Sequence, residues 1–523
     1  MNSNNSPAIL KALIAYAICV PLAVAVGWLL ASESVVSQPG GINWAWNVLI
    51  LFKSHPYVWG SLILILCSPV LLRWHHLLLV ASWNLGMVMY FMPGNPGLWM
   101  PMVALSLGIS ILYRALNSKA HFVSAPEITF PLIFMAAVVL FTAKLTGGIG
   151  LHSLGSEVMG GRYYLSILIG ILGYFALTAQ RIPPERAGLY VAVFFLSGFA
   201  LAIGDLVNVM PSSLNFLFAL FPPNSYILSG DARYAGTACM AEFCFWLMLA
   251  KYGIRGIFLS GKWWRPVVLG LSFAAVFLGG FRSLVVLCVM VFFVQFLLER
   301  MYRTKLLPAF AFVGITLVTL CIPFADKLPF AFQRSLAFLP LHIDPMARED
   351  AMASLDWRLQ IWQAVLPEVP DHLLLGKGYA LSQADYQDMN GGFHSDLAQD
   401  WGSAIAGDYH NGPLSVILPL GIWGVIAVLW LGIASLRALY FNYRYGDAGL
   451  KTVNLFFLAY FIAKILMFLF IFGSLYGDFY SFIGIIGLSI SLNGGIRRRA
   501  AVPVQTEAET NIPALARPRL QPF

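Results

Sequence analysis

Long apolar segments recur along almost the whole of this chain, and they constrain its fold more than any other feature. A helix of about 20 apolar residues spans the hydrocarbon core of a bilayer, so we interpret segments near that length as candidate spanning helices. Fourteen runs fit this description: 9–31, 56–72, 75–92, 98–114, 128–143, 163–179, 187–204, 236–250, 266–280, 283–298, 307–324, 413–434, 452–472 and 479–493. The sequence therefore predicts an all-α polytopic membrane protein with about 14 (12–14) transmembrane helices.

The composition agrees with a membrane protein and excludes two other classes. Hydrophobic residues make up 59% of the 523 residues, and charged residues make up only 11%. Soluble domains carry about 25% charged residues, so an ordinary cytosolic enzyme is excluded. A disordered chain is excluded as well, because disorder requires low hydrophobicity and high net charge. The polar, proline-rich tail 501–523 is expected to be disordered.

The basic residues are distributed unevenly, and their distribution predicts the orientation of the chain. With the N-terminus inside, 21 of the 32 Lys and Arg residues fall in cytoplasmic segments. Cytoplasmic loops of membrane proteins carry an excess of Lys and Arg, so we expect both termini in the cytoplasm. The net charge of +8 is then a signal of topology, and no nucleic-acid partner is expected.

The segment 325–412 is the longest stretch between apolar runs and is expected on the extracytoplasmic side. It contains twelve acidic and five basic residues, and a loop of this length without a function would be unusual. Apolar residues at spacings of three and four predict an amphipathic helix. This helix would start at Ser354 or Asp356 and run to about Leu366, where Pro367 ends it.

Two charged residues, Glu242 and Lys464, lie inside apolar runs. A charged side chain at the centre of a spanning helix costs roughly 2.5–3.5 kcal/mol on insertion scales, so both side chains must face protein or a wet cavity. In one interpretation they pair with each other and have a structural role. In the other interpretation they are intramembrane charges with a functional role.

Three arginines are expected on the outer side, against the general trend of the basic residues. Arg282 lies in a very short turn between two runs, Arg358 lies on the predicted amphipathic helix, and Arg233 precedes the run 236–250. Guanidinium groups bind diphosphates through planar bidentate hydrogen bonds and stay charged at physiological pH. If these arginines converge at the outer leaflet, they would suit a lipid-linked diphosphate. Alternatively, each of them forms an ion pair with the acidic loop.

His410 immediately precedes a predicted spanning helix, in which Asn411 fits the N-cap and Pro413 fits the first turn. This position would hold the imidazole on a rigid element at the membrane surface. A neutral histidine there can accept a proton from a sugar hydroxyl. The alternative is a histidine with a structural role only.

The sequence predicts neither a metal site nor a cofactor. A metal-dependent membrane glycosyltransferase needs clustered acids in its first outer loop, and here that loop has only Glu33. The nearest match to a phosphate-binding loop ends in Gly261-Lys262, but Trp263 follows where the motif requires Ser or Thr.

Four motifs resemble the O-antigen ligase and polymerase superfamily in their order and spacing. They are G-G-F-R-S at 279–283, D-W-R-L-Q-I-W-Q-A-V-L at 356–366, L-L-L-G-K-G-Y at 373–379 and H-N-G-P-L-S-V-I-L-P-L-G-I-W-G at 410–424. The resemblance covers roughly 279–434. It divides the chain into an N-terminal transmembrane region (1–278), a ligase-like core that includes the loop 325–412 (279–434), C-terminal transmembrane helices (435–500) and a cytoplasmic tail (501–523).

The resemblance implies a C-type membrane glycosyltransferase fold in the bacterial inner membrane, with the active site on the periplasmic side. It implies an undecaprenyl-diphosphate-linked glycan as donor and an inverting, metal-independent transfer. Arg282 and Arg358 would hold the diphosphate, and His410 would act as base on the acceptor hydroxyl, or orient it. We add three candidate binding residues for the diphosphate or the glycan: Arg233, Tyr409 and Asn411.

The acceptor is left open by the sequence. Ligases of this kind transfer the glycan to lipid A-core, whereas the related polymerases transfer it to a growing O-antigen or exopolysaccharide chain. A transporter or flippase of lipid-linked sugars is the alternative from another class. Transporters place their sites near the bilayer midplane, whereas the candidate residues here gather at one face beside a long loop.

Overall fold

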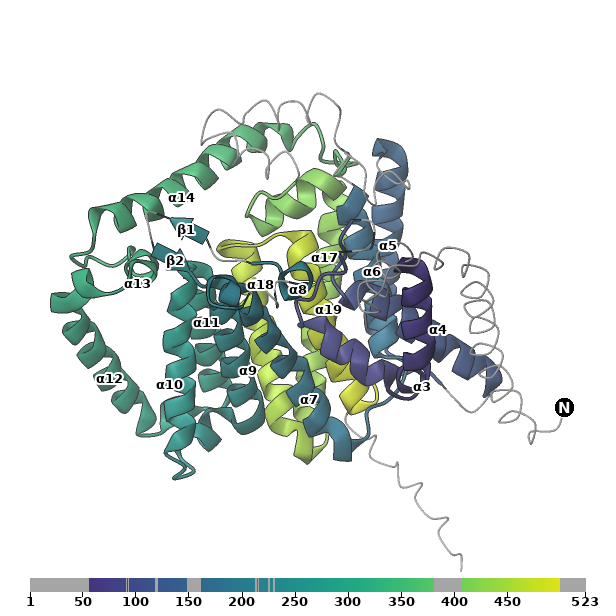
Figure 1. Ribbon diagram of the computed structural model, residues 1–523, viewed down its shortest axis with the longest axis horizontal. Coiled ribbons are helices and arrows are strands. Elements are labelled where there is room, and N and C mark those ends of the chain that lie inside the picture. The colour runs from purple at the N-terminus through teal and green to yellow at the C-terminus, as the bar shows by residue number, and fades with distance from the viewer. Residues whose placement is uncertain are drawn as a thin grey trace, which may run out of the picture.

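The fold is a bundle of helices with a smaller helical layer across one end (Figure 1). The computed structural model describes residues 56–90, 92, 94–117, 121–147, 161–211, 214, 216–223, 226–228, 231–380 and 407–498. Four parts of the sequence analysis lie outside the described residues. They are the apolar run 9–31, the first outer loop with Glu33, the loop section 381–406 and the tail 501–523.

Helices dominate the described part of the chain, as the sequence predicts. In chain order they are α3 (Pro56–Trp83), α4 (Trp99–Leu116), α5 (Pro126–Thr146), α6 (Gly161–Leu177), α7 (Ala187–Leu196), α8 (Phe216–Leu220), α9 (Ala235–Phe258), α10 (Trp264–Val276), α11 (Arg282–Leu298), α12 (Leu306–Cys321), α13 (Phe330–Ser335), α14 (Pro345–Val365), α17 (Gly412–Tyr445), α18 (Lys451–Phe470) and α19 (Leu475–Asn493). The two short strands β1 (Tyr226–Leu228) and β2 (Asp231–Arg233) pair antiparallel, with Tyr226 opposite Arg233.

Six helical segments of the described residues are long and apolar enough to cross a membrane: Trp99–Leu116, Pro126–Thr146, Pro184–Val207, Gly412–Tyr445, Ala448–Phe470 and Leu475–Asn493. Shorter apolar helices accompany them, including Gly161–Leu177 and Arg282–Leu298. The chain is therefore a helical membrane protein. The larger number of spans expected from the apolar runs stays a prediction.

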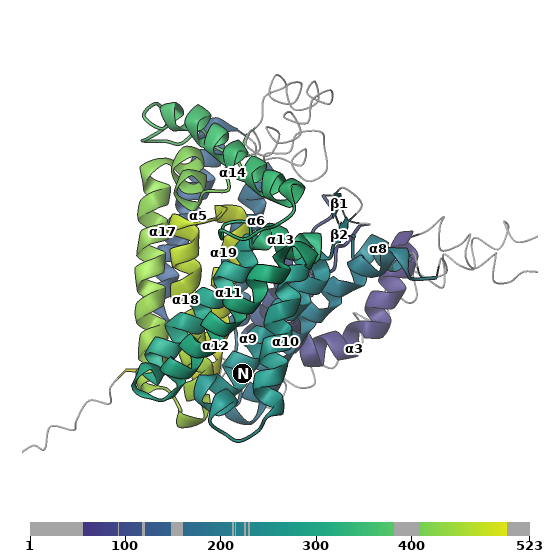
Figure 2. The ribbon, with the colours of Figure 1, turned by 90° about the vertical axis from the view of Figure 1, so that its left-hand side faces the viewer.

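The core of the bundle is formed by helices that are far apart in the sequence. Helix α17 packs along α5 and α18, α19 packs on α6, and α11 packs on α18. The largest fully buried side chains are mostly aromatic, among them Trp83, Trp246 and Tyr164. The C-terminal helices therefore connect two groups of earlier helices: α17 and α19 pack on α5 and α6, and α18 packs on α11 (Figure 2).

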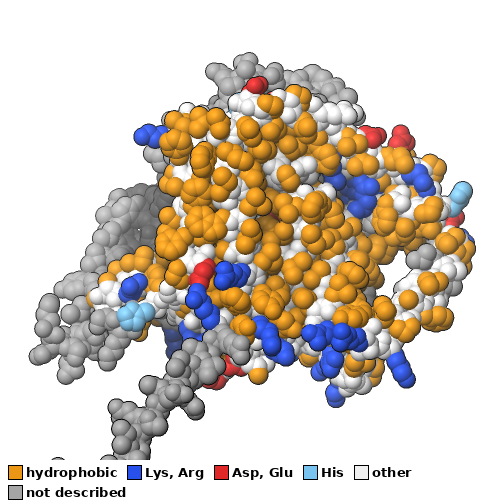
Figure 3. Space-filling model, turned by 180° about the vertical axis from the view of Figure 1, so that it is seen from behind, with side chains coloured by type: hydrophobic (Ala, Val, Ile, Leu, Met, Phe, Trp, Pro, Cys, Tyr) orange, Lys and Arg blue, Asp and Glu red, His pale blue; other side chains and the backbone are white. Residues whose placement is uncertain are grey.

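The surface of the bundle is apolar over most of the face seen in Figure 3, and many of the Lys and Arg side chains on that face lie along its lower part. Many apolar side chains on the outside of the helices are exposed, such as Phe141, Phe293 and Ile433. A surface of this kind suits contact with lipid, since large apolar patches are rare on soluble proteins.

The helix α14 lies across one end of the bundle, with α13 beneath it (Figures 1 and 2). It is longer than predicted, because its N-cap is Asp344 and neither Ser354 nor Asp356. The Asp344 side chain accepts a hydrogen bond from the Met346 amide, and Pro345 occupies the first turn, where its missing N–H costs nothing. The predicted C-terminal end is confirmed at Val365.

Candidate active site

His410 lies immediately before the N-cap of α17, in a backbone conformation that few residues other than glycine adopt. Its φ angle is +49°, in the left-handed region. Asn411 is the N-cap of α17, and its side chain accepts a hydrogen bond of 3.1 Å from the Leu414 amide. This cap and the position of Pro413 in the first turn confirm the predicted start of the helix. The imidazole is therefore carried by a rigid helix terminus.

Polar and aromatic partners fix the orientation of the His410 ring. Its Nδ1 lies 2.9 Å from Oδ1 of Asp408, and Oδ2 of Asp408 accepts a hydrogen bond of 3.0 Å from the Tyr476 hydroxyl. The ring meets Trp357 edge-on at a centroid distance of 5.0 Å and lies 5.2 Å from Phe472. Nδ1 is thus engaged by Asp408, and Nε2 has no hydrogen-bond partner among the described residues.

Asp408 is suited to bind the His410 ring in its ionised, carboxylate form. Burial works to raise the pKa of Asp408, but the hydrogen bonds and charge of His410 and the hydrogen bond from Tyr476 outweigh burial. The pKa of Asp408 therefore lies below its ordinary value. An ionised carboxylate at Nδ1 fixes the tautomer of the ring and stabilises the imidazolium that forms when Nε2 takes up a proton.

Arg358 shares an aromatic neighbour with His410. Its guanidinium carbon lies 5.2 Å from the centroid of the Phe472 ring, the same ring that contacts the histidine. The Nε of Arg358 is buried without a hydrogen-bond partner in the described part of the chain. Burial, followed by the nearby charges of Arg282 and Arg334, lowers the pKa of Arg358. An anionic ligand would relieve both effects.

A second group of arginines surrounds Asp350 on α14. Asp350 Oδ2 forms an ion pair of 2.8 Å with Arg233 and a further ion pair with Arg334. Arg334 also donates to the carbonyl of Gly280 over 2.6 Å. Arg282 donates to the carbonyl of Ala351 over 2.9 Å. These contacts fasten α14 to the turn that begins α11.

The two interpretations of the outer arginines apply to different members of the group. Arg233 is paired with an acid of the loop, as the structural interpretation expects. Arg282 and Arg358 form no ion pair with any acid that the structure describes. The guanidinium groups of Arg282, Arg334 and Arg358 are close enough for their charges to repel. Positive charge is therefore concentrated locally, around Arg282, Arg334 and Arg358.

The segment Leu373–Gly378 explains the third sequence motif. It inserts into a break in α17 at Gly421, whose φ is +64°. The amide of Lys377 donates to the carbonyl of Leu418 over 2.7 Å, and the amide of Ile422 donates to the carbonyl of Leu373, also over 2.7 Å. A Cβ at Gly376 would lie 2.3 Å from the Pro419 carbonyl, so only glycine fits there.

Tyr409 and Asn411 are both occupied by local structure. Tyr409 is only 1% exposed and packs against Ile361, Val365 and Leu418, and its carbonyl accepts a hydrogen bond of 2.8 Å from Trp362. Asn411 caps α17. A role for either residue in contact with substrate stays a prediction.

Sequence reasoning missed four residues of this site: Arg334, Asp350, Asp408 and Tyr476. Arg233 and Asp350 are 117 positions apart in the chain, and Asp408 and Tyr476 are 68 positions apart. Only the place of Asp408, two residues before His410, was a local signal for one of them. Within the described ranges, no cluster of three or more His, Cys, Asp or Glu side chains could hold a metal ion.

The intramembrane charges Glu242 and Lys464 lie apart from this site. In the structure Lys464 Nζ forms its ion pair with Asp478, at 2.7 Å, and not with Glu242, as one of the two interpretations had it. Asp478 lies in the first turn of α19, where an acidic side chain is favoured by the helix dipole. Both Glu242 and Lys464 line the same cavity.

Comparison with known protein families agrees with the motifs. No curated protein matches the chain. A family model described as O-antigen ligase matches residues 267–429, a segment that runs from α10 into α17. The match includes Arg282, Arg358 and His410. Residues 267–429 are therefore similar to the O-antigen ligase family, as the motifs in this part of the sequence predict.

Proposed function

We propose that the protein is a membrane glycosyltransferase that moves an undecaprenyl-diphosphate-linked glycan onto an acceptor hydroxyl. The contact of both Arg358 and His410 with the ring of Phe472 carries this proposal, because it brings a diphosphate-binding group beside a base. The family match to residues 267–429 supports a transfer of the ligase or polymerase type.

The donor diphosphate binds to Arg358 and Arg282. Both guanidinium groups lack an ion-pair partner in the part of the chain that the structure describes, and each can form bidentate hydrogen bonds with phosphate oxygens. Arg334 and Arg233 keep α14 in place through Asp350 and add positive charge nearby. As the leaving group gains negative charge in the transition state, the interaction with these arginines strengthens and lowers the barrier. This arrangement assigns to guanidinium groups the charge neutralisation that a cation supplies in metal-dependent enzymes.

The acceptor is activated by His410. Its Nε2 takes the proton of the acceptor hydroxyl as the oxygen bonds to the anomeric carbon of the donor sugar. The bond from that carbon to the diphosphate breaks on the opposite face, and its electron pair leaves with the diphosphate. The configuration of the anomeric carbon is therefore inverted. Asp408, held by Tyr476, stabilises the imidazolium that results.

The reaction takes place at the periplasmic face of the inner membrane, with both termini in the cytoplasm. The cytoplasmic side is assigned from the basic residues of the sequence, and the end of the bundle that carries α14 is then the outer end. The lipid tail of the donor stays among membrane lipids. The acceptor is lipid A-core or, in a polymerase, the growing polysaccharide.

The length of the glycan left on undecaprenyl diphosphate in a strain without this protein distinguishes the two reactions. Long glycans on the carrier identify a ligase, because chain growth continues and only the final transfer is lost. Single repeat units identify a polymerase. Unchanged glycan on the carrier would contradict both and would favour a transporter of lipid-linked sugars.

A further inference from the structure

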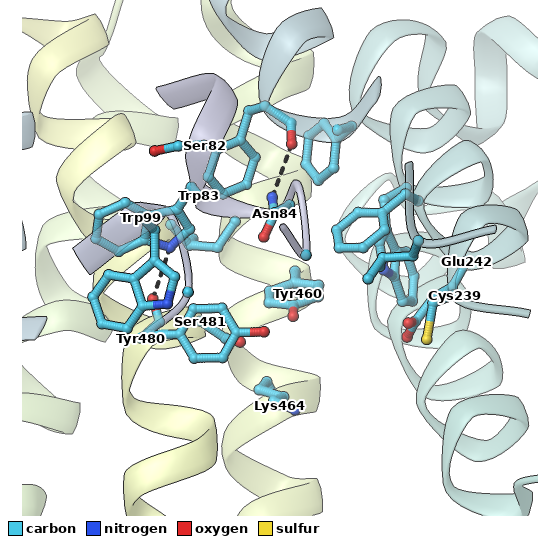
Figure 4. Close-up of a pocket in the computed structure, with 18 of the residues that line it drawn as sticks. Ser82, Trp83, Asn84, Trp99, Cys239, Glu242, Tyr460, Lys464, Tyr480 and Ser481 are labelled. Carbon is cyan, nitrogen blue, oxygen red and sulfur yellow. Dashed lines mark hydrogen bonds between the residues drawn. The ribbon is translucent and has the colours of Figure 1, made fainter. Parts of the chain in front are cut away.

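A cavity of about 370 Å³ lies inside the bundle, and none of the arginines of the candidate active site lines it. Its volume falls in the range of about 300–1,000 Å³ that is typical of small-molecule sites. Figure 4 shows Trp83, Trp99 and Tyr480 on one side and Glu242 on the other, with Tyr460 between them. The Trp99 and Tyr480 rings stack with an interplanar angle of 22° and form a flat aromatic wall.

The cavity lies directly inward of the candidate active site, because the same helices line both. Arg282 begins α11, and Leu284 and Leu287 of that helix line the cavity. On α19, Tyr476 holds Asp408, and Tyr480 lines the cavity one turn further, about 6 Å along the axis. The cavity and the candidate active site are therefore neighbours along α11 and α19.

The polar groups of the cavity are few and unequal. Lys464 is paired with Asp478 at 2.7 Å. Glu242 is 8% exposed and, among the described residues, has neither a hydrogen-bond partner nor an ion-pair partner. A buried carboxylate without hydrogen bonds is costly, so this group requires water or a ligand that donates hydrogen bonds.

We propose that this cavity binds one sugar ring of a saccharide substrate, a proposal that rests on the function proposed above. A pyranose has an apolar face of C–H groups, which fits the wall of Trp99 and Tyr480, and a rim of hydroxyls. These hydroxyls donate to the Glu242 carboxylate and accept from the Lys464 ammonium group. The bound ring comes from the donor glycan or from the acceptor, since both present the same chemistry.

Two other ligands fit the cavity less well. A polyprenyl chain would leave the Glu242 carboxylate against hydrocarbon without a hydrogen bond. A diphosphate would meet the Glu242 carboxylate, and the single cation of the lining, Lys464, is already paired with Asp478. A neutral ligand that has both hydroxyls and an apolar face is the class that satisfies the whole lining.

The first test is the kinetics of Glu242→Gln. The amide keeps the shape of the side chain and loses its charge, so we expect KM for one saccharide substrate to rise about tenfold, with kcat within about twofold of the wild type. A rise in KM for the donor or for the acceptor identifies the source of the sugar. Glu185→Gln, at an exposed position, is the matched control and should change neither constant. A fall in kcat with both KM values unchanged, or no change at all, would overturn the proposal.

The second test measures binding without turnover and remains informative if the kinetic variant fails to insert. Cys239 lines the cavity, whereas Cys244, on the same helix and also half-buried, does not. Two variants are compared, one that keeps Cys239 and lacks Cys244 and one that keeps Cys244 and lacks Cys239. In each variant the rate at which a small methanethiosulfonate modifies the remaining cysteine of the pair is measured. The probes are the oligosaccharide released from lipid A-core and the glycan released from the carrier.

We expect one of the two saccharides to protect Cys239 and neither to protect Cys244. Equal rates for Cys239 with and without both saccharides would show that the cavity holds only water, and would overturn the proposal. Because protection needs no catalysis, it is separate from the proposed function. If His410→Ala kept full transfer activity while Cys239 was still protected, the mechanism would fail and the sugar site would stand.

Discussion

The arginine site at α14 and the cavity beside Glu242 have opposite balances of charge. In the arginine site, four guanidinium groups (Arg233, Arg282, Arg334 and Arg358) lie near two carboxylates, Asp350 and Asp408. In the cavity and at its edge, the carboxylates of Glu242 and Asp478 face a single ammonium group, that of Lys464. This difference fits the two proposed roles, in which the arginine site binds the anionic diphosphate and the cavity binds an uncharged sugar.

The largest effect is expected at His410. We expect His410→Ala to reduce the rate of glycan transfer by about 10²–10⁴-fold, because the base for the acceptor hydroxyl is lost. Transfer is measured in membranes that contain equal amounts of each variant. His342→Ala, an exposed histidine of the same loop, is the control and should retain full activity. Full activity in His410→Ala would show that the histidine has no part in the mechanism, and the arginine site would then lack its proposed base.

Arg358 tests whether the outer site recognises a diphosphate through geometry or through charge alone. Arg358→Ala should lower kcat by about 10²–10³-fold, as expected for a lost group that stabilises the leaving oxygen. Arg358→Lys keeps the charge and loses the planar guanidinium group, so its kcat should lie between that of Arg358→Ala and that of the wild type. Arg348→Lys, on the same helix, is the matched control. If Arg358→Lys were as active as the wild type, bidentate recognition would be contradicted.

A glycine substitution tests whether the outer site depends on the break in α17. In Gly376→Ala the new Cβ would clash with the Pro419 carbonyl, and alanine would be strained at a φ of +69°. We expect a loss of about 2 kcal/mol in stability, seen as a lower Tm of the purified protein. Gly270→Ala is the control, because its Cβ meets open space, and it should be neutral or stabilising by up to about 1 kcal/mol. Equal Tm values for the two variants would show that the segment Leu373–Gly378 is not essential to the fold.

The smallest effect tests the independence of the two regions. Arg358 and Glu242 share no contact, so the losses in kcat/KM of Arg358→Lys and Glu242→Gln should multiply to within about twofold in the double variant. The measurement is a double-mutant cycle on the transfer reaction. If kcat/KM of the double variant differed from the product of the two single losses by much more than twofold, the arginine site and the cavity would be energetically coupled, and their independence would be contradicted.

The sequence predicts best those features that depend on neighbouring residues. Asn411 and Pro413 predict the start of α17, and Pro367 predicts the end of α14, because caps and helix breakers act locally. The start of α14 was placed too late, since Asp344 and Pro345 are an equally good beginning and the apolar spacing gave no reason to extend the helix to them.

Long-range partners could not be predicted in the same way. Lys464 and Glu242 were the conspicuous charges, yet Lys464 pairs with Asp478, an acid at the edge of an apolar run that attracted no attention. Arg334 and Asp350 meet only because α13 and α14 fold over the turn at Gly280. The pattern of residue types identifies which groups need a partner, and only the packing of helices decides which partner they find.

The docking of Leu373–Gly378 into the break of α17 affects how the binding energy of the substrate can be used. Helix α14 is joined to α17 on one side by Trp362 and Tyr409 and on the other by Leu373 and Ile422. Arg358 and His410 therefore belong to one rigid unit whose conformational entropy is already lost when the protein folds. The binding energy of the substrate does not have to assemble these two groups, and it remains available for bringing the anomeric carbon and the acceptor oxygen into line.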